Sequence, residues 1–218
     1  MTYSCFAKLT DILFVTTAKN YKMKKHWLLL IPILFISLLS SSQHFVTTNP
    51  QLKNVVLEEF TGINCPYCPY GHQAAQAIAS ANPGRVHIIN IHTGYYAEPQ
   101  GSQPDFTTEY GSSLVSQANI AGYPSGTVNR YFFPDLSSAG GTAMSRNDWD
   151  NAADRIFDKA SYVNIGLQST YNSNTRELEV LVDMYFPQGS ELPESFMLNL
   201  ALTENNVTAY QAGGGNSY

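Results

Sequence analysis

The chain has 218 residues, and 44% of them are hydrophobic, which is enough to bury a core. Its formal net charge of −5 argues against a nucleic-acid-binding protein, because such binding depends on basic contacts to phosphate. The length suits one domain of ordinary size together with a smaller second piece.

The N-terminal part has the composition of an export signal. Lys24 and Lys25 precede an apolar run, residues 27–39, and small residues follow it. A basic segment, a short apolar segment and small residues together predict a secretory signal peptide. The apolar run is shorter than the roughly 20 residues that a membrane span needs, and an uncleaved anchor is the alternative.

The signal divides the N-terminal part into three predicted segments. We expect residues 1–22 to be a gene-call extension, residues 23–42 to be the signal peptide and residues 43–52 to be a linker. Cleavage would remove Cys5 and five of the twelve basic residues, so the mature protein would be more acidic and would keep two cysteines. Export would place these thiols in an oxidising compartment, where disulfides persist.

Residues 53–160 alternate between strand-like and helix-like segments. The pattern predicts, in chain order, a strand at 55–60, a helix at 73–81, a strand at 86–91, a helix that Asp105 caps and that stops near Gly122, a strand at 127–133, and a helix that follows Ser145 and Asp148 and reaches Ala160. Strands that alternate with helices are typical of an α/β domain with a central sheet.

Residues 161–218 follow a different pattern, in which apolar and polar residues alternate. Three segments show it, at 163–167, 178–186 and 196–202. A period of two predicts antiparallel strands with one buried face, and residues 172–174 supply a hairpin turn. We therefore predict a β-rich module of about three strands. We expect it to be incomplete, because flexible turn residues stand where a closing strand is expected.

Cys65-Pro66-Tyr67-Cys68 lies between the first predicted strand and the first predicted helix. Two thiols at this spacing can open and close a disulfide, and the N-terminal end of a helix lowers a thiol pKa. Cys65 is expected to be the exposed nucleophile, and Cys68, one turn into the helix, to resolve the mixed disulfide. Pro66 and Pro69 fit at or before the first helical turn, where a missing N–H costs nothing.

The cysteine pair has two other interpretations. A static disulfide would hold the start of the helix. Alternatively, the two thiolates with His72 and either His87 or His92 would suit Zn²⁺, although these histidines lack the regular spacing of most zinc sites. We predict redox activity instead, with no metal and no other cofactor.

The region around the motif resembles the first strand and active-site turn of the thioredoxin fold. Glu59-Phe60 is followed after four residues by Cys-Pro-Tyr-Cys, and the Pro66-Tyr67 dipeptide is typical of glutaredoxins. In thioredoxins a buried aspartate six residues before the first cysteine accepts a proton from the resolving thiol. That offset lands on Glu59, which departs from the pattern by one methylene and has Glu58 beside it. An exposed carboxylate at the strand end is the alternative.

Residues 120–127 resemble the segment of the same fold in which a cis-proline precedes an antiparallel strand. The resemblance assigns this role to Pro124, an ordinary trans proline being the alternative. It also implies that the backbone of Tyr123 lies beside the sulfurs and pairs with an extended substrate. The predicted substrate-binding residues are Pro66, Tyr67, Tyr123 and Pro124, and the predicted catalytic residues are Glu59, Cys65 and Cys68.

Nearly all of the mature chain resembles the twenty-eight-kilodalton outer-membrane-protein family of Gram-negative anaerobes and their relatives. The resemblance is carried by the signal peptide, the pattern EEFTGxxCxxCP, the GYPSGTVNR segment, a helix with a tryptophan and the β-rich tail. It implies a thioredoxin-like α/β domain at 53–160, with a central mixed sheet flanked by helices. An antiparallel, sandwich-like β module is implied at 161–218.

The resemblance also implies a location in the periplasm, at the outer membrane or at the cell surface. We predict an exported thiol-disulfide oxidoreductase that acts on protein thiols or disulfides of the cell envelope. The alternative is a non-catalytic, outer-membrane-associated structural or binding protein that uses the thioredoxin-like unit as a scaffold.

Overall fold

The computed structural model describes residues 3–7, 45–187 and 197–214, and the chain divides into two compact units. The larger unit contains Asn49–Tyr162 and Pro187–Tyr218 together with Met1–Leu9, and the smaller one contains Thr10–Thr48 and Val163–Phe186. The predicted signal peptide, and the predicted extension apart from residues 3–7, lie outside the described residues. Of the described helices, none combines the length and hydropathy that a membrane crossing requires.

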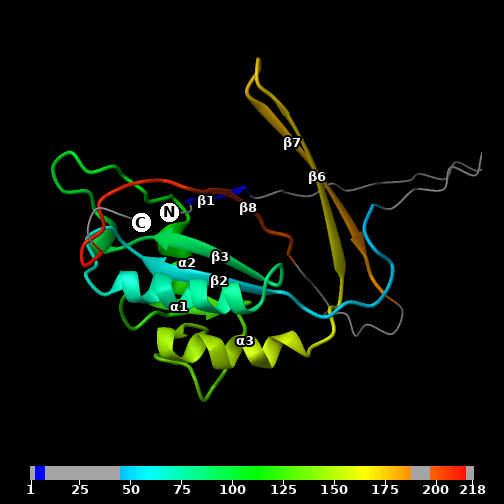
Figure 1. Ribbon diagram of the computed structural model, residues 1–218, viewed down its shortest axis with the longest axis horizontal. Helices are drawn as coiled ribbons and strands as arrows, with labels where there is room; N and C mark the ends of the chain where they lie inside the picture. The colour runs from blue at the N-terminus through cyan, green and yellow to red at the C-terminus, as the bar shows by residue number, and fades with distance from the viewer. Residues whose placement is uncertain (1–2, 8–44, 188–196, 215–218) are drawn as a thin grey trace, which may run out of the picture. The chain divides into compact units, whose positions relative to one another are not determined.

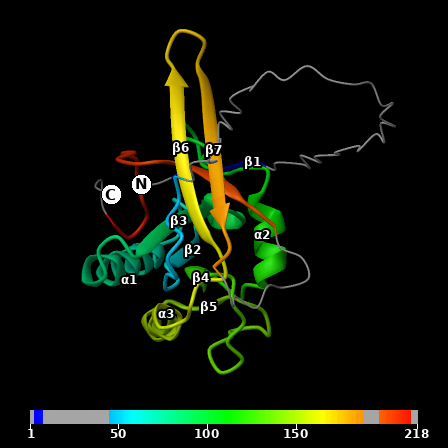
Figure 2. The same ribbon diagram turned by 90° about the vertical axis from the view of Figure 1, so that its right-hand side faces the viewer.

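The larger unit is built on a mixed sheet with the strand order β3–β2–β4–β5; Figure 1 labels β2 and β3, and Figure 2 labels all four strands. β2 (Val55–Thr61) lies parallel to β3 (Val86–His92) and antiparallel to β4 (Ser125–Val128), which pairs antiparallel with β5 (Met144–Ser145). Nearly all of β2 is buried: its apolar residues Val55, Leu57 and Phe60 pack in the core, as expected for a strand covered on both faces, and its two glutamates are buried as well.

Helices cover both faces of this sheet. They are α1 (Cys68–Ala81), α2 (Gly111–Ala118) and α3 (Trp149–Phe157), with the short 3-10 helices η1 (Tyr95–Ala97) and η2 (Arg146–Asp148). Leu57 packs with α1 and α3 in one buried cluster, and Phe60 packs with α2 in another. Residues three apart on a strand point to opposite faces, so α2 lies across the sheet from α1 and α3 (Figure 2). The predicted thioredoxin-like arrangement is confirmed.

Several element boundaries in this domain differ from the prediction, among them the end of α3 at Phe157 instead of Ala160. α1 begins at Cys68, five residues early, since Pro69 is tolerated in a first helical turn. Asp105 caps no helix: its carboxylate accepts hydrogen bonds from the N–H and hydroxyl of Thr107 at 2.9 and 2.7 Å, and α2 begins only at Gly111. β4 ends at Val128 because Asn129 and the residue after it adopt positive φ, which interrupts an extended strand.

The smaller unit contains a separate antiparallel sheet of β6 (Asn164–Asn172) and β7 (Glu177–Tyr185). The turn lies where the sequence predicts it, and the side-chain oxygen of Asn172 accepts bonds from the N–H groups of Asn174 and Thr175 at 3.0 and 3.3 Å. Asp183 accepts a 2.9 Å bond from the N–H of Phe45, which belongs to the same unit. This sheet is the predicted β module.

The third strand expected in that module has another partner. β8 (Leu200–Glu204) pairs antiparallel with β1 (Tyr3–Ala7), and both belong to the larger unit. Alternation of apolar and polar residues identifies a strand but not its neighbour, which is why the sequence assigned this strand to the same module as β6 and β7. From β8 the chain continues to the cysteine pair.

Candidate functional site

Cys65 and Cys68 are joined by a disulfide at the point where β2 gives way to α1. Their Cα atoms are 5.4 Å apart, inside the usual range for a disulfide. The N–H of Cys65 donates to the carbonyl of Gly62 at 3.0 Å, and the N–H of Cys68 donates to the carbonyl of Cys65 at 3.4 Å. The backbone thus forms a tight turn that delivers the second cysteine to the first helical position.

The exposure of the cysteines differs from the prediction. Cys65 is only 1% exposed and Cys68 is fully buried, so the expectation of an exposed Cys65 is wrong. The two residues between them remain at the surface, with Tyr67 63% exposed. The sequence could not reveal this, because the side chains that cover the turn come from distant parts of the chain.

Glu59 lies beneath the first turn of α1 and is fully buried, which rules out the alternative of an exposed strand-end carboxylate. Its Oε2 is 3.0 Å from Nδ1 of His72. A Cβ added to Gly71 would overlap its Oε1 and would lie 2.9 Å from Cβ of Pro124. Gly71 and His72 follow Cys68 by one helical turn, so Glu59 lies against the face of α1 that also carries Cys68.

Burial raises the pKa of Glu59, and the hydrogen bond from His72 opposes this rise. Oε1 of Glu59 has no hydrogen-bond partner among the described residues. A carboxyl group in such surroundings favours its protonated form, because burial penalises charge. Glu59 is therefore suited to hold a proton beside the cysteine pair.

Glu58 is separated from Glu59 by the pleat of β2 and has a different role. Its carboxylate accepts hydrogen bonds from Nε of Arg130 at 2.7 Å and from the hydroxyl of Thr127 at 3.1 Å. This buried ion pair links β2 to the end of β4. The two adjacent glutamates are thus unambiguous in the structure: Glu58 is structural, and Glu59 faces the site.

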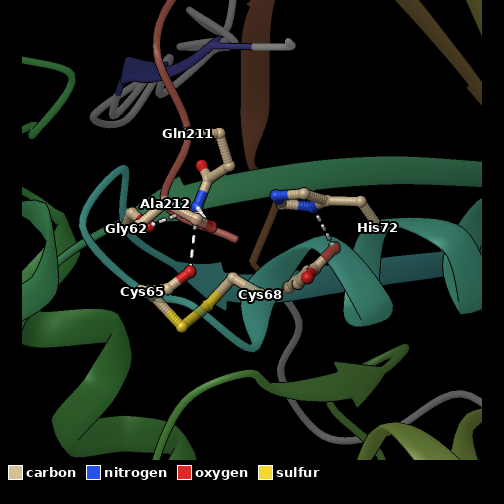
Figure 3. The surroundings of a disulfide bond; sticks show 7 residues. Gly62, Cys65, Cys68, His72, Gln211 and Ala212 are labelled. Atoms are coloured by element: carbon tan, nitrogen blue, oxygen red, sulfur yellow. Dashed lines mark hydrogen bonds and ion pairs between the residues drawn. A yellow bond between two sulfur atoms is a disulfide. The ribbon is translucent and has the colours of Figure 1, made fainter. Parts of the chain in front are cut away.

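His72 is the site residue that the sequence interpretation missed, since it treated this residue only as a metal ligand or a solvated side chain. Its side chain is 10% exposed and contacts Glu59 (Figure 3). The spacing between Cys68 and His72 in the sequence could have identified it. A residue four positions after Cys68 lies on the same helix face, and that face packs on the strand carrying Glu59.

Two of the four predicted substrate-binding residues, Pro66 and Tyr67, belong to the turn, and Pro124 lies near Gly71 of α1. Pro66 and Tyr67 are exposed, Tyr123 is half-buried, and Pro124 is buried. The Tyr123–Pro124 peptide bond is cis, as predicted. Tyr123 packs edge-to-face on Tyr96, whose carbonyl accepts a 2.9 Å bond from the N–H of Asn64. The contact of these residues with a substrate stays a prediction.

The metal alternative needs two free thiolates, and the disulfide occupies both. His87 is exposed and lies opposite Val56 in the sheet, whereas His92 lies opposite Thr61 at the other end of β2. The two histidines are therefore at opposite ends of β3. Within the described ranges, no three histidine, cysteine or acidic side chains cluster as metal ligands would.

His92 is a buried imidazole at the end of β3. It is 3% exposed, and its ring meets Phe106 edge-to-face at 5.3 Å. Burial, with a smaller contribution from the charge of His72, lowers the pKa of His92 to about 4. This residue therefore stays neutral at physiological pH.

The shift of His92 predicts how stability depends on pH. Between pH 6.5 and 4 the unfolded chain binds a proton that folded His92 does not, so stability should fall as pH is lowered. The effect is about 1.4 kcal/mol per unit of pKa difference. Urea unfolding at pH 7 and pH 5 should show a smaller pH dependence in His92→Phe than in wild type. The same substitution at exposed His87 should leave the dependence unchanged, and equal slopes in His92→Phe and wild type would refute the prediction.

Residues 205–214, which follow β8, also contribute contacts to the cysteine turn, and the sequence interpretation missed them. Gln211 is fully buried, and its Nε2 donates to the carbonyls of Cys65 and Gly62 at 3.0 and 3.1 Å (Figure 3). The N–H of Ala212 donates to the carbonyl of Ile63 at 2.8 Å. No local pattern marks Gln211, because its partners lie about 150 residues earlier in the chain.

The comparisons with known proteins are limited. No protein-family model matches the chain, and no curated protein matches it. The solved structure of HBP35 of Porphyromonas gingivalis is 25% identical, covers 55% of this chain and has a TM-score of 0.41. A structural-genomics protein of Agrobacterium tumefaciens is 16% identical, covers 60% and has a TM-score of 0.40. The chain spans 38% and 56% of their respective lengths, less than two thirds of either.

These similarities are too weak to support a conclusion about function. The fold assignment rests on the order β3–β2–β4–β5, the pairing directions and the helices on both faces. The chain carries a thioredoxin-like domain with a disulfide-bonded cysteine pair where its central strand meets its first helix, and it carries a separate antiparallel β sheet.

Proposed function

We propose that this protein is a thiol-disulfide oxidoreductase and that Cys65 and Cys68 exchange disulfides with client proteins. The observation that carries the proposal is the placement of a buried carboxyl group, Glu59, under the helical turn that bears the cysteine pair. A structural disulfide needs no such group. A disulfide that opens in a buried site does, because the departing thiolate must be neutralised.

The exchange begins when a client thiolate attacks Sγ of Cys65. The bond between Cys65 and Cys68 breaks, a mixed disulfide forms between the client and Cys65, and Cys68 leaves as a thiolate that takes the proton of Glu59. A second client thiolate attacks the client sulfur of the mixed disulfide and releases Cys65 as a thiolate. Two electrons thus pass from the client dithiol to the cysteine pair, so the client gains a disulfide, and the reverse sequence reduces a client disulfide.

Location and partners belong to the same proposal. The signal-like segment at 23–42 supports export, and the motifs around 58–69 and 122–130 support kinship with the twenty-eight-kilodalton outer-membrane-protein family. An exported protein of this kind acts in the periplasm or at the outer membrane and cell surface. Its clients there are envelope proteins with thiols or disulfides.

A non-catalytic function is the second candidate, and the burial of the cysteines favours it. With Cys65 only 1% exposed, an attacking thiolate cannot reach the sulfur in this conformation. A static disulfide would then hold α1 against β2. The protein would act as an outer-membrane-associated structural or binding component on a thioredoxin-like scaffold.

Alkylation and turnover together separate the two candidates. In the reduced protein, the Cys65 thiol should react with iodoacetamide with a pH midpoint well below about 8.5, since a helix N-terminus stabilises the thiolate. Catalytic amounts of the protein should accelerate the reduction of insulin disulfides by dithiothreitol.

The control variants test the roles of the two thiols. Cys65→Ser should lose the acceleration, and Cys68→Ser should retain an attacking thiol and accumulate mixed disulfides. A midpoint near 8.5 without turnover that depends on Cys65 would leave only the non-catalytic function.

A further inference from the structure

We propose that residues 205–214 form a strap that shields the Cys65–Cys68 disulfide and must open before a client can react. We call this segment the Gln211 strap. The inference deepens the proposed function and rests on it for its biological meaning. The shielding itself is a physical property that is measured separately.

The strap is attached to the cysteine turn by its side chain and by its backbone. The amide of Gln211 donates to the carbonyls of Gly62 and Cys65, at 3.1 and 3.0 Å, so it bridges the two ends of the turn. The N–H of Ala212 donates to Ile63 between them at 2.8 Å. Three hydrogen bonds thus bind one short segment to the carbonyls of Gly62, Ile63 and Cys65.

Gly213 brings the strap into direct contact with the CPYC motif. Its φ is +78°, and a Cβ added there would overlap the carbonyl oxygen of Pro66 and lie 3.1 Å from Cα of Pro66. The backbone of the strap therefore lies directly against the residue that follows Cys65. Only glycine combines this φ with this approach.

The strap is also a part of the site that can detach from the cysteine turn by local opening. It is irregular in structure, and the neighbouring Tyr210 is 51% exposed. Oε1 of Gln211 is buried without a hydrogen-bond partner in the described part of the chain, so closure leaves one polar atom unsatisfied. An irregular segment with exposed residues opens locally at lower free energy than the strands of a sheet.

Shielding reconciles the buried cysteines with redox chemistry. In the closed arrangement the strap is bonded to the carbonyl of Cys65, a residue that is 1% exposed, and we expect the disulfide to resist small thiols. When it opens, the sulfur of Cys65 becomes available for in-line attack. Reaction then selects clients that bind while the strap is open.

The test measures reduction of the disulfide in the full mature chain by tris(2-carboxyethyl)phosphine, which needs no catalytic thiol. Gln211→Ala removes the bridging amide and should accelerate reduction about tenfold, equivalent to about 1.4 kcal/mol of strap opening. Gly213→Val should accelerate it at least as much, because its side chain overlaps Pro66. Gln76→Ala is the matched control: Gln76 lies exposed on α1, and this change should leave the rate unaltered.

The wild-type protein supplies a second measurement that does not depend on any variant folding. If the strap opens locally, reduction of wild type should be almost insensitive to low urea, and the Ala212 amide should exchange hydrogen faster than the amides of β2. Equal reduction rates in wild type and Gln211→Ala would overturn the proposal. So would wild-type reduction that tracks global unfolding.

Failure of the proposed function gives a different result. The strap variants would still be reduced faster by the phosphine, but the reduced protein would show no insulin reduction that depends on Cys65. Shielding would then stand as protection of a structural disulfide.

Discussion

Replacement of Glu59 by glutamine is expected to slow disulfide exchange about a hundredfold, the lower end of what a positioned acid or base contributes. Glu59 is fully buried, and burial raises its pKa, so it holds the proton that Cys68 needs when it leaves. Glutamine has nearly the same shape but no transferable proton. The rate should be measured by stopped-flow exchange between a dithiol peptide and the oxidised protein.

The pH profile distinguishes this role from a merely structural one. The wild-type profile should contain an ionisation above the ordinary pKa of about 4.5 for a glutamic acid, and the Glu59→Gln profile should lack it. The same substitution at exposed Glu109 should change neither the rate nor the profile. An unchanged profile in Glu59→Gln, even with a slower rate, would contradict the assignment.

The raised pKa of Glu59 also has a consequence for stability, with the sign opposite to that of His92. A carboxyl group whose pKa is higher in the folded state stabilises the protein fully below its unfolded pKa, and this contribution is lost as pH rises through the folded pKa. Glu59→Gln should therefore gain stability relative to wild type as pH rises. Stability and activity thus conflict at this residue, as is common where a charge is buried for chemistry.

Truncation of Trp149 to alanine is expected to lower the free energy of unfolding by about 3–5 kcal/mol. Trp149 is fully buried, and its Nε1 donates to the carbonyl of Met144 at 3.4 Å. Its ring lies directly on Gly126, where an added Cβ would be 2.8 Å from Cζ2. Because Gly126 is opposite Glu59 in the sheet, the indole supports the strand pair that carries the site.

Urea unfolding followed by circular dichroism measures this loss without relying on tryptophan emission. Phe132→Ala is the control in the same domain, since Phe132 is 47% exposed and its truncation should change stability by less than about 1 kcal/mol. A loss of similar size in both variants would mean that Trp149 is not a centre of the core.

Much of the larger unit could be predicted because its signals are local. β2 and β3 are apolar β-rich runs, and a helix follows the cysteine turn, so the sequence locates the CPYC motif between strand and helix. The failure at Asp105 shows the limit of local signals. An aspartate that could cap a helix bonds Thr107 instead, and propensity does not decide between these uses.

The two glutamates of β2 show what the alternating direction of side chains along a strand does and does not predict. Side chains of adjacent strand residues point to opposite faces of the sheet, so the sequence predicts that Glu58 and Glu59 lie on opposite faces. Their partners, Arg130 and His72, come from β4's far end and from α1. Only the packed sheet determines which glutamate meets the helix that carries Cys68.

The sequence by itself determined the alternation of strands and helices, the cysteine pair before the first helix and the change to a β-rich pattern after residue 160, because these follow from short-range periodicity and spacing. The thioredoxin-like character of the domain was implied by the resemblance of its motifs to that fold. The tertiary structure decided which of these features meet. It placed His72 on Glu59, paired β8 with β1, and bonded Gln211 to the backbone carbonyl of Cys65. Such contacts join residues far apart in the chain. Their free energy depends on burial and geometry that no window of sequence contains.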